Sequence, residues 1–143
     1  MIQSSRSITK TDTIYAAFEN YIMEETYDAA FFKIAQLLFD EDRKLTSALD
    51  ELQYLDFTQI GLPTYIKDER RQVQRATVIF EKIGSFRTPS DKLDCLLHTI
   101  SELTGQDEYS VGTDALVPLL LMTLIRSKVP HLTANLVYMK VIT

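Results

Sequence analysis

Apolar residues recur along this chain of 143 residues at intervals of three and four, the spacing that gathers them on one face of an α-helix. No stretch of the sequence alternates apolar and polar residues in the way typical of a half-buried strand. Glycines, prolines and charged runs separate the periodic stretches from one another. The sequence therefore predicts an all-α fold, a helical bundle with a layered helical core.

The composition is that of an ordinary globular protein, with 45% hydrophobic and 24% charged residues. A net charge of −5 argues against nucleic acid as a partner, because phosphate binding needs clustered lysine and arginine. One cysteine, Cys95, forms no intrachain disulfide and, with only two histidines, no structural zinc site. We therefore expect no cofactor and no bound metal, and a cytoplasmic location.

The N-terminal third of the chain is predicted to be mostly helical. Met1 to Lys10 is polar and is expected to be a flexible, frayed lead-in. A helix begins near Asp12, and the apolar set from Tyr27 to Phe39 either continues it or belongs to a second helix that begins after Asp28. The charged run Asp40 to Arg43 then interrupts the pattern. The mostly apolar stripe of the helix that begins near Asp12 consists of Ile14, Ala17, Phe18, Tyr21, Ile22 and Glu25.

Two helices follow in the middle of the chain. Leucines and Ala48 between Leu45 and Leu55 have the spacing of a buried helix face, which should end before Gly61. Lys67 to Ile83 is amphipathic, with a basic side that is expected to face solvent, and Gly84 is placed as its C-terminal stop.

The next helix has a clear start, because Thr88 can cap it, Pro89 suits the first helical position, and Asp91 follows as in a capping box. Its predicted buried stripe is Leu93, Leu96, Leu97, Ile100 and Leu103. After a polar loop over 106–111 and one more helix, Thr133 can cap a last helix. That helix is expected to turn Leu136, Val137 and Met139 inward.

Two prolines delimit the helix that lies between the polar loop over 106–111 and the last helix. Proline is tolerated in the first turn of a helix, so Pro118 predicts a helix start between about Thr113 and Val117. Pro130 ends the helix on the other side. Asp114 therefore lies at or just before a helix N-terminus, where its simplest role is that of an N-cap.

Short motifs along most of the chain resemble the VPS-nine (vacuolar protein sorting nine) domain, the family of guanine nucleotide exchange factors for early-endosomal Rab GTPases. In order, the motifs are Pro89-Ser90-Asp91-Lys92-Leu93-Asp94-Cys95 with Ile100, Gly112-Thr113-Asp114 with Leu116 and Pro118, Val129-Pro130, and Asn135-Leu136-Val137-Tyr138. Residues 19–24 with Tyr27 and Phe31 resemble the helical-bundle segment that precedes that domain. We expect a lead-in at 1–10, this segment at 11–66 and a VPS-nine core at 67–143.

The resemblance implies an exchange factor for the Rab-five subfamily that acts in endocytosis, vesicle trafficking and protein transport. Such a protein is a GTPase regulator without covalent chemistry. Asp114 matches the family's aspartate finger, and Pro118 and Leu121 are expected to contact the GTPase. The longest apolar run, Ala115 to Ile125, is shorter than the roughly 20 residues of a membrane span, so we expect peripheral recruitment to endosomal membranes rather than insertion.

A second function remains open, that of a non-catalytic helical interaction module that binds a GTPase or a trafficking complex. For Asn135 and Tyr138 a structural role is expected, because an asparagine near a helix start satisfies local backbone groups and a tyrosine there packs its ring. For Leu121, Met122 and Ile125 a core position is favoured over one in the GTPase groove, with the alternative open that one side of their helix is exposed for partner binding. His98 is expected at the surface or partly packed, and Cys95 as a small core residue or at a neutral helix position.

Members of the family continue beyond the position of Tyr138 into a segment with Gly-Glu, a tyrosine and a threonine, which forms the other wall of the GTPase groove. Met139 to Thr143 does not match that segment. We therefore expect the VPS-nine core to lack its C-terminal helices, which leaves apolar surface on the helix over 115–125 uncovered.

Uncovered apolar surface predicts that the 143-residue chain by itself self-associates, or depends on a missing segment or partner. Light scattering over a range of protein concentrations should then report oligomers. A monodisperse monomer that also accelerates nucleotide release would contradict this expectation.

Overall fold

A computed structural model describes residues 2–56, 59–61, 69–104 and 113–142. These residues form six α-helices and one 3₁₀ helix, and no strand occurs among them, so the all-α prediction is confirmed. In chain order the helices are α1 (Ile2–Leu37), α2 (Phe39–Glu51), α3 (Glu69–Phe80), the 3₁₀ helix η2 (Glu81–Ser85), α4 (Pro89–Thr104), α5 (Thr113–Ser127) and α6 (Leu132–Ile142). The expected loop over 106–111 lies outside the described residues.

Helix α1 is one continuous helix through Asp28 to Leu37, which decides the alternative that the sequence left open. It also includes Ile2 to Lys10, the segment expected to be a flexible lead-in. A single residue, Leu38, separates α1 from α2. The charged run from Asp40 to Arg43 is therefore not an interruption: three acids occupy the first turn of α2, where they complement the helix dipole.

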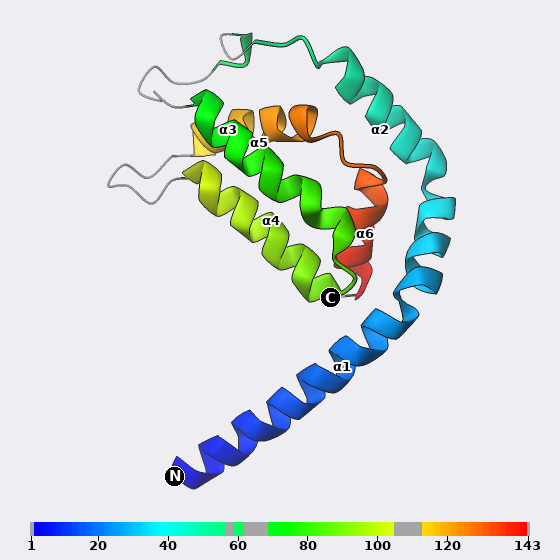
Figure 1. Ribbon diagram of the computed structural model, residues 1–143, viewed down its shortest axis with the longest axis vertical. Helices are drawn as coiled ribbons and strands as arrows, with labels where there is room; N and C mark the ends of the chain where they lie inside the picture. Colours follow the sequence, from blue (N-terminus) through cyan, green and yellow to red (C-terminus); the bar gives the residue numbers. More distant parts are fainter. Residues whose placement is uncertain (1, 57–58, 62–68, 105–112, 143) are drawn as a thin grey trace.

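Helices α3, α4, α5 and α6 form the body of the molecule, and α1 and α2 follow one another in a long arc around it (Figure 1). Helix α3 packs against both α4 and α5, while α6 is contacted by α1, α2 and α4. The N-terminal half of α1 projects away from the body.

The core consists of two clusters of buried apolar residues, and α3 contributes residues to both. One joins α3, α4 and α5 through Val73, Ala76, Leu103, Leu119, Met122 and Ile125. The other lies at the opposite end, around Phe80, Ile83, Cys95, Val129, Leu132 and Met139. Met122, Ile125 and Cys95 therefore occupy the core positions that the sequence predicted.

The buried face of α4 differs from the predicted leucine stripe. Leu93 and Leu97 are 40% and 53% exposed, whereas Lys92, Cys95 and Thr99 are buried. Helical periodicity failed here because a buried lysine and threonine find hydrogen-bond partners inside the fold, and the sequence pattern carries no information about those partners.

The start of α4 is as predicted, since the Thr88 hydroxyl accepts a hydrogen bond of 3.1 Å from the backbone N–H of Asp91. The predicted stop at Gly84 was wrong. Gly84 lies inside η2 with no left-handed conformation, and α3 ends by tightening into this 3₁₀ turn before Phe86 becomes extended.

The start of α6 is capped from a distant part of the chain. Oδ1 of Asp42 accepts a hydrogen bond of 2.6 Å from the N–H of Thr133, and Oδ2 accepts one of 3.3 Å from the N–H of Ala134. Thr133 is therefore not the cap, because it already lies within the helix. Leu136 is 39% exposed rather than inward, whereas Met139 is buried as expected.

One buried cation joins four elements. Lys92 on α4 is fully buried, and its ammonium group donates hydrogen bonds to the carbonyl of Ile83 at 2.9 Å and to Oδ1 of Asn135 at 2.5 Å. The same group lies 5.1 Å from the ring centroid of Tyr27, 5.2 Å from that of Phe31 and 6.0 Å from that of Tyr138, within cation–π range. Burial lowers the pKa of Lys92 to about 8.

The partners of Lys92 are themselves fixed by the backbone. The Asn135 amide donates to the carbonyl of His131 at 3.0 Å, and the Tyr138 hydroxyl donates to the carbonyl of Arg87 at 3.0 Å. Both side chains are almost fully buried. The structural role predicted for Asn135 and Tyr138 is confirmed, and Lys92 is the partner that the sequence did not reveal.

We predict that Lys92→Met lowers the free energy of unfolding by about 2 kcal/mol, because two buried acceptors lose a charged donor while the packed volume is kept. Urea denaturation followed by circular dichroism measures the difference. Lys82→Met on η2, where the side chain is exposed, is the control and should change stability little. Equal stability of both variants would contradict the role given to Lys92.

Candidate functional site

Helix α5 begins at Thr113, within the predicted interval, and Asp114 is its second residue. Asp114 is exposed. It therefore lies within the first turn rather than at the N-cap, and no hydrogen bond to its carboxylate comes from any residue that the structure describes. The simplest role expected from the sequence, a capping aspartate, is not the arrangement found, and the carboxylate remains accessible to another molecule.

Asp114 shares one face of α5 with three apolar side chains. Val117, Pro118 and Leu121 follow it at intervals of three, four and seven residues, which places all four on the same side of a helix. Val117 is 60% exposed, Leu121 is 37% exposed, and Pro118 is half-buried. We call these four residues the α5 face. It combines one negative charge with an apolar surface beside it.

The opposite side of α5 holds this face in place. Ala115, Leu119 and Met122 are fully buried, and α5 packs mainly on α3. At its C-terminal end, the Arg126 guanidinium donates hydrogen bonds of 3.1 Å to the carbonyls of Gln53 and Leu55, in the segment that follows α2. A helix fixed on both sides presents its exposed residues with little freedom to move relative to the body.

Pro118 is the sixth residue of α5 and lies inside the helix, not in its first turn as expected. Because proline has no N–H, it cannot donate the helical hydrogen bond that the carbonyl four residues earlier would accept. That carbonyl belongs to Asp114. The proline thus releases a backbone acceptor at the same residue that carries the exposed carboxylate.

Val117 is the residue of the α5 face that the sequence analysis missed. Its position three residues after Asp114 is a helical interval, so the signal was present once the helix start was known. The expected uncovered apolar surface on this helix is therefore found in part, as Val117 and Leu121.

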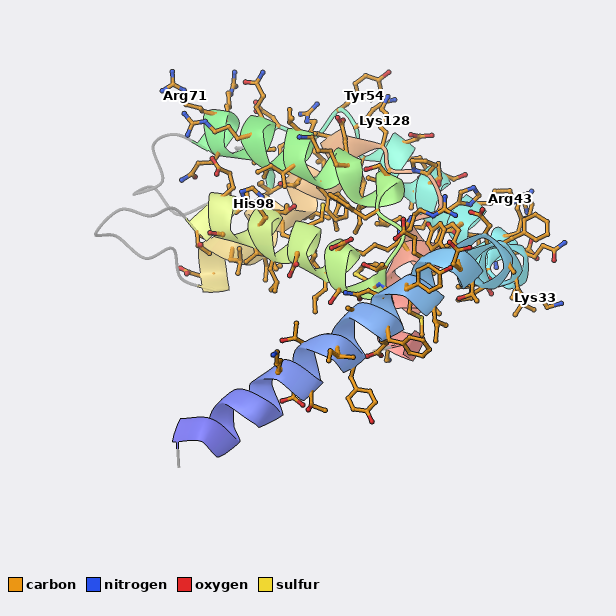
Figure 2. All side chains as sticks on the ribbon, turned by 60° about the horizontal axis from the view of Figure 1, so that its bottom comes forward. Lys33, Arg43, Tyr54, Arg71, His98 and Lys128 are labelled. Atoms are coloured by element: carbon orange, nitrogen blue, oxygen red, sulfur yellow. The ribbon has the colours of Figure 1, made fainter. Side chains whose placement is uncertain are left out.

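Within the part of the chain that the structure describes, the residues with potential for covalent chemistry do not assemble a further site. Cys95 is buried, its thiol lies 3.3 Å from the carbonyl of Ile79, and burial raises its pKa, which disfavours the reactive thiolate. His98 is exposed on α4, as predicted (Figure 2). Arg70 and Arg75 on α3 are exposed and form ion pairs with Asp56 and Glu102.

Comparison with known families identifies the body of the fold. Residues 73–142, from the first buried residue of α3 to the end of α6, match the Vacuolar sorting protein 9 (VPS9) domain. These residues belong to the VPS9 domain family. The resemblance stated from short motifs is thereby confirmed. The α5 face lies wholly within the matched range.

A relative extends the similarity beyond the VPS9 domain itself. A UPF0507 protein of Yarrowia lipolytica is 25% identical over 130 residues, which cover 85% of this chain and 12% of that protein. The chain thus spans a small part of the length of this relative.

The match to the VPS9 domain suggests, in general terms, regulation of a Rab GTPase by nucleotide exchange. As to membranes, none of the helices within the described residues is both long and apolar enough to cross a bilayer.

Proposed function

We propose that this VPS9 domain is a guanine nucleotide exchange factor for Rab GTPases of the early-endosomal, Rab-five subfamily, and that Asp114 accelerates the release of GDP. The observation that supports the proposal is the exposed carboxylate of Asp114 on a helix fixed against the core. A carboxylate that was buried, or hydrogen-bonded to its own backbone, could not reach a nucleotide on another protein.

The chemistry of the bound nucleotide explains what such a carboxylate does. A GTPase holds its nucleotide through a lysine on the phosphates and through a Mg²⁺ ion. A negative charge brought among these groups repels the phosphates, competes for the lysine and displaces the metal. Since this charge interacts favourably with the GTPase only when the nucleotide has left, the complex with the empty GTPase is the one that is stabilised.

The apolar part of the α5 face supplies the binding that keeps the carboxylate in place. Val117 and Leu121 can bury their exposed surface against an apolar region of the GTPase, which favours association without depending on the nucleotide. Pro118 lies between them in the sequence, one turn after Asp114, and its ring restricts the backbone of α5 there. In this proposal the acid provides the selectivity for the empty state, and the apolar residues provide affinity.

The proposal includes the rest of the chain. Residues 11–66 act as a helical-bundle segment that supports the VPS9 core over 67–143, and the protein works in endocytosis and vesicle trafficking after peripheral recruitment to endosomal membranes. The cap that Asp42 provides to α6, and the contact between Tyr27 and Lys92, support a structural rather than a catalytic role for the N-terminal segment.

We predict that Asp114→Asn slows accelerated GDP release by roughly 100-fold, the magnitude typical of the loss of one positioned electrostatic group. Release of a fluorescent GDP analogue from a panel of Rab GTPases measures the rate. Asp91→Asn is a matched control, because Asp91 is also an exposed aspartate in the first turn of a helix, α4. Both variants lose the same helix-dipole interaction, so only Asp114→Asn should lose exchange.

Two outcomes would overturn the proposal. Rates unchanged by Asp114→Asn, with Rab binding intact, would favour the non-catalytic interaction module. Acceleration confined to Rab GTPases outside the early-endosomal subfamily would contradict the proposed specificity.

We also predict that Leu121→Ser raises the Kd for a nucleotide-free Rab GTPase about ten-fold, because buried apolar contact at the interface is lost. Isothermal titration calorimetry measures the affinity. Leu97→Ser on α4 is the control, since Leu97 is an exposed leucine away from the α5 face. Equal affinities of the two variants would place the Rab interface elsewhere.

A further inference from the structure

The outward side of α1 carries large apolar side chains that the fold does not use. Ile14, Phe18, Tyr21 and Phe32 are between 63% and 65% exposed. At 3.6 residues per turn they lie within roughly 60° of one another around the helix. We call these four residues the α1 stripe. Glu25 and Asp28 lie on the same face between Tyr21 and Phe32. With them included, successive residues of this face are alternately four and three positions apart.

The other side of α1 makes the contacts with the body. Tyr27 is buried, stacks on Phe31 with ring centroids 5.1 Å apart, and meets the edge of Tyr138 at 5.3 Å. These contacts belong to the C-terminal half of the helix. Residues 10–22 are exposed on every side, and both views show the N-terminal half of α1 standing clear of the other elements (Figures 1 and 2).

A helix in this position needs a partner for two physical reasons. A helix within a protein gains most of its stability when an apolar face packs against other elements, and this half of α1 has no such packing. A row of exposed aromatic and aliphatic side chains on one helix face is also typical of an interface. At the C-terminal end of the stripe a pocket of about 450 Å³ is lined by Phe32, Ala35, Gln36, Phe39 and His131, and it can receive a large apolar side chain.

The charge on α1 indicates the chemistry of the partner. From residue 11 to residue 32 the sequence has five acids and no lysine, arginine or histidine. Asp12, Glu19, Glu24 and Glu25 are exposed, and Asp28 binds Arg87 at 3.0 Å. A surface that joins an apolar seam to a row of carboxylates is complementary to a helix whose apolar seam is bordered by lysine and arginine.

A second copy of the chain fits this surface poorly. In a parallel pair of α1 helices, Glu25 would face Glu25 of the other copy. In an antiparallel pair centred on the stripe, Glu25 would lie opposite Tyr21 of the other copy and Asp28 opposite Phe18. Either arrangement places carboxylates inside an apolar seam with no cation from the other copy to pair with them, which is destabilising. An anionic membrane surface is disfavoured by the same acids.

We propose that the α1 stripe is a docking surface for a basic amphipathic helix of a partner protein. The partner helix pairs with α1 as in a coiled coil, sets an apolar side chain into the pocket beside Phe32, and places a basic side chain opposite Glu25. This surface is separate from the α5 face, so its occupation does not depend on the exchange activity proposed above.

Two synthetic helical peptides of about four heptads test the proposal, both with the same leucine and isoleucine seam. One carries lysine at the flanking positions and at one central seam position, and the other carries glutamate there. Fluorescence anisotropy with the 143-residue chain should show binding of the lysine peptide, weakening as salt is raised, and no binding of the glutamate peptide.

A matched pair of substitutions locates the binding surface. Tyr21→Ser should weaken binding of the lysine peptide about ten-fold, the size expected for an aromatic interface anchor. Tyr15→Ser should have little effect, because Tyr15 is a similarly exposed tyrosine of α1 that points about 120° away from Tyr21. The double change Glu24→Lys and Glu25→Lys should reverse the preference in favour of the glutamate peptide. The same double change at Asp50 and Glu51 on α2 is its control.

Several outcomes would overturn the proposal. Equal binding of the two peptides, or equal effects of Tyr21→Ser and Tyr15→Ser, would show that the stripe does not select a basic helix. Sedimentation that reports a dimer dissolved by Tyr21→Ser would identify a second copy as the occupant. Stripe-dependent binding to vesicles of anionic lipid would identify a membrane instead.

Discussion

The position of Lys92 is the constraint on which the rest of the structure depends. A fully buried ammonium group is stable only where acceptors and aromatic faces replace its water, and here these come from α1, η2 and α6. Each of the three elements is therefore fixed relative to α4 by the same atom. Because α4 in turn packs on α3 and α5, the orientation of the α5 face follows from contacts that lie on the other side of the core.

Local sequence signals predicted the parts of the fold that depend on local interactions. The start of α4 was predictable because Thr88 and Pro89 act within one turn of each other. The start of α5 fell within the predicted interval, although Pro118 lies inside the helix and not in the first turn on which that prediction rested. The buried face of α4 was not, since the leucines at positions 93 and 97 match the helical period better than Lys92 and Thr99 do. Lys92 is buried because its hydrogen-bond acceptors lie on other elements, η2 and α6.

The same division holds for the candidate site and for α1. That Asp114 lies at a helix start could be derived from the sequence, and its exposure could not, because burial depends on what packs beside α5. Periodicity also identified the apolar stripe of α1 correctly as a helix face. It could not distinguish a face turned to the core from one turned outward, since both have the same spacing. In α1 the outward stripe is apolar, while Tyr27 is the buried residue on the inner side among the α1 side chains that the structure describes.

The cap that Asp42 gives to α6 has a consequence for how the chain folds. The carboxylate and the two amides that it binds are separated by about ninety positions, so this contact forms only after α6 has been made. During synthesis α2 emerges long before α6. Until α6 arrives, Asp42 has no amide to bind and Lys92 lacks Asn135. The contacts that fix α6 to α2 and α4 therefore form only after the helices before it have been synthesised.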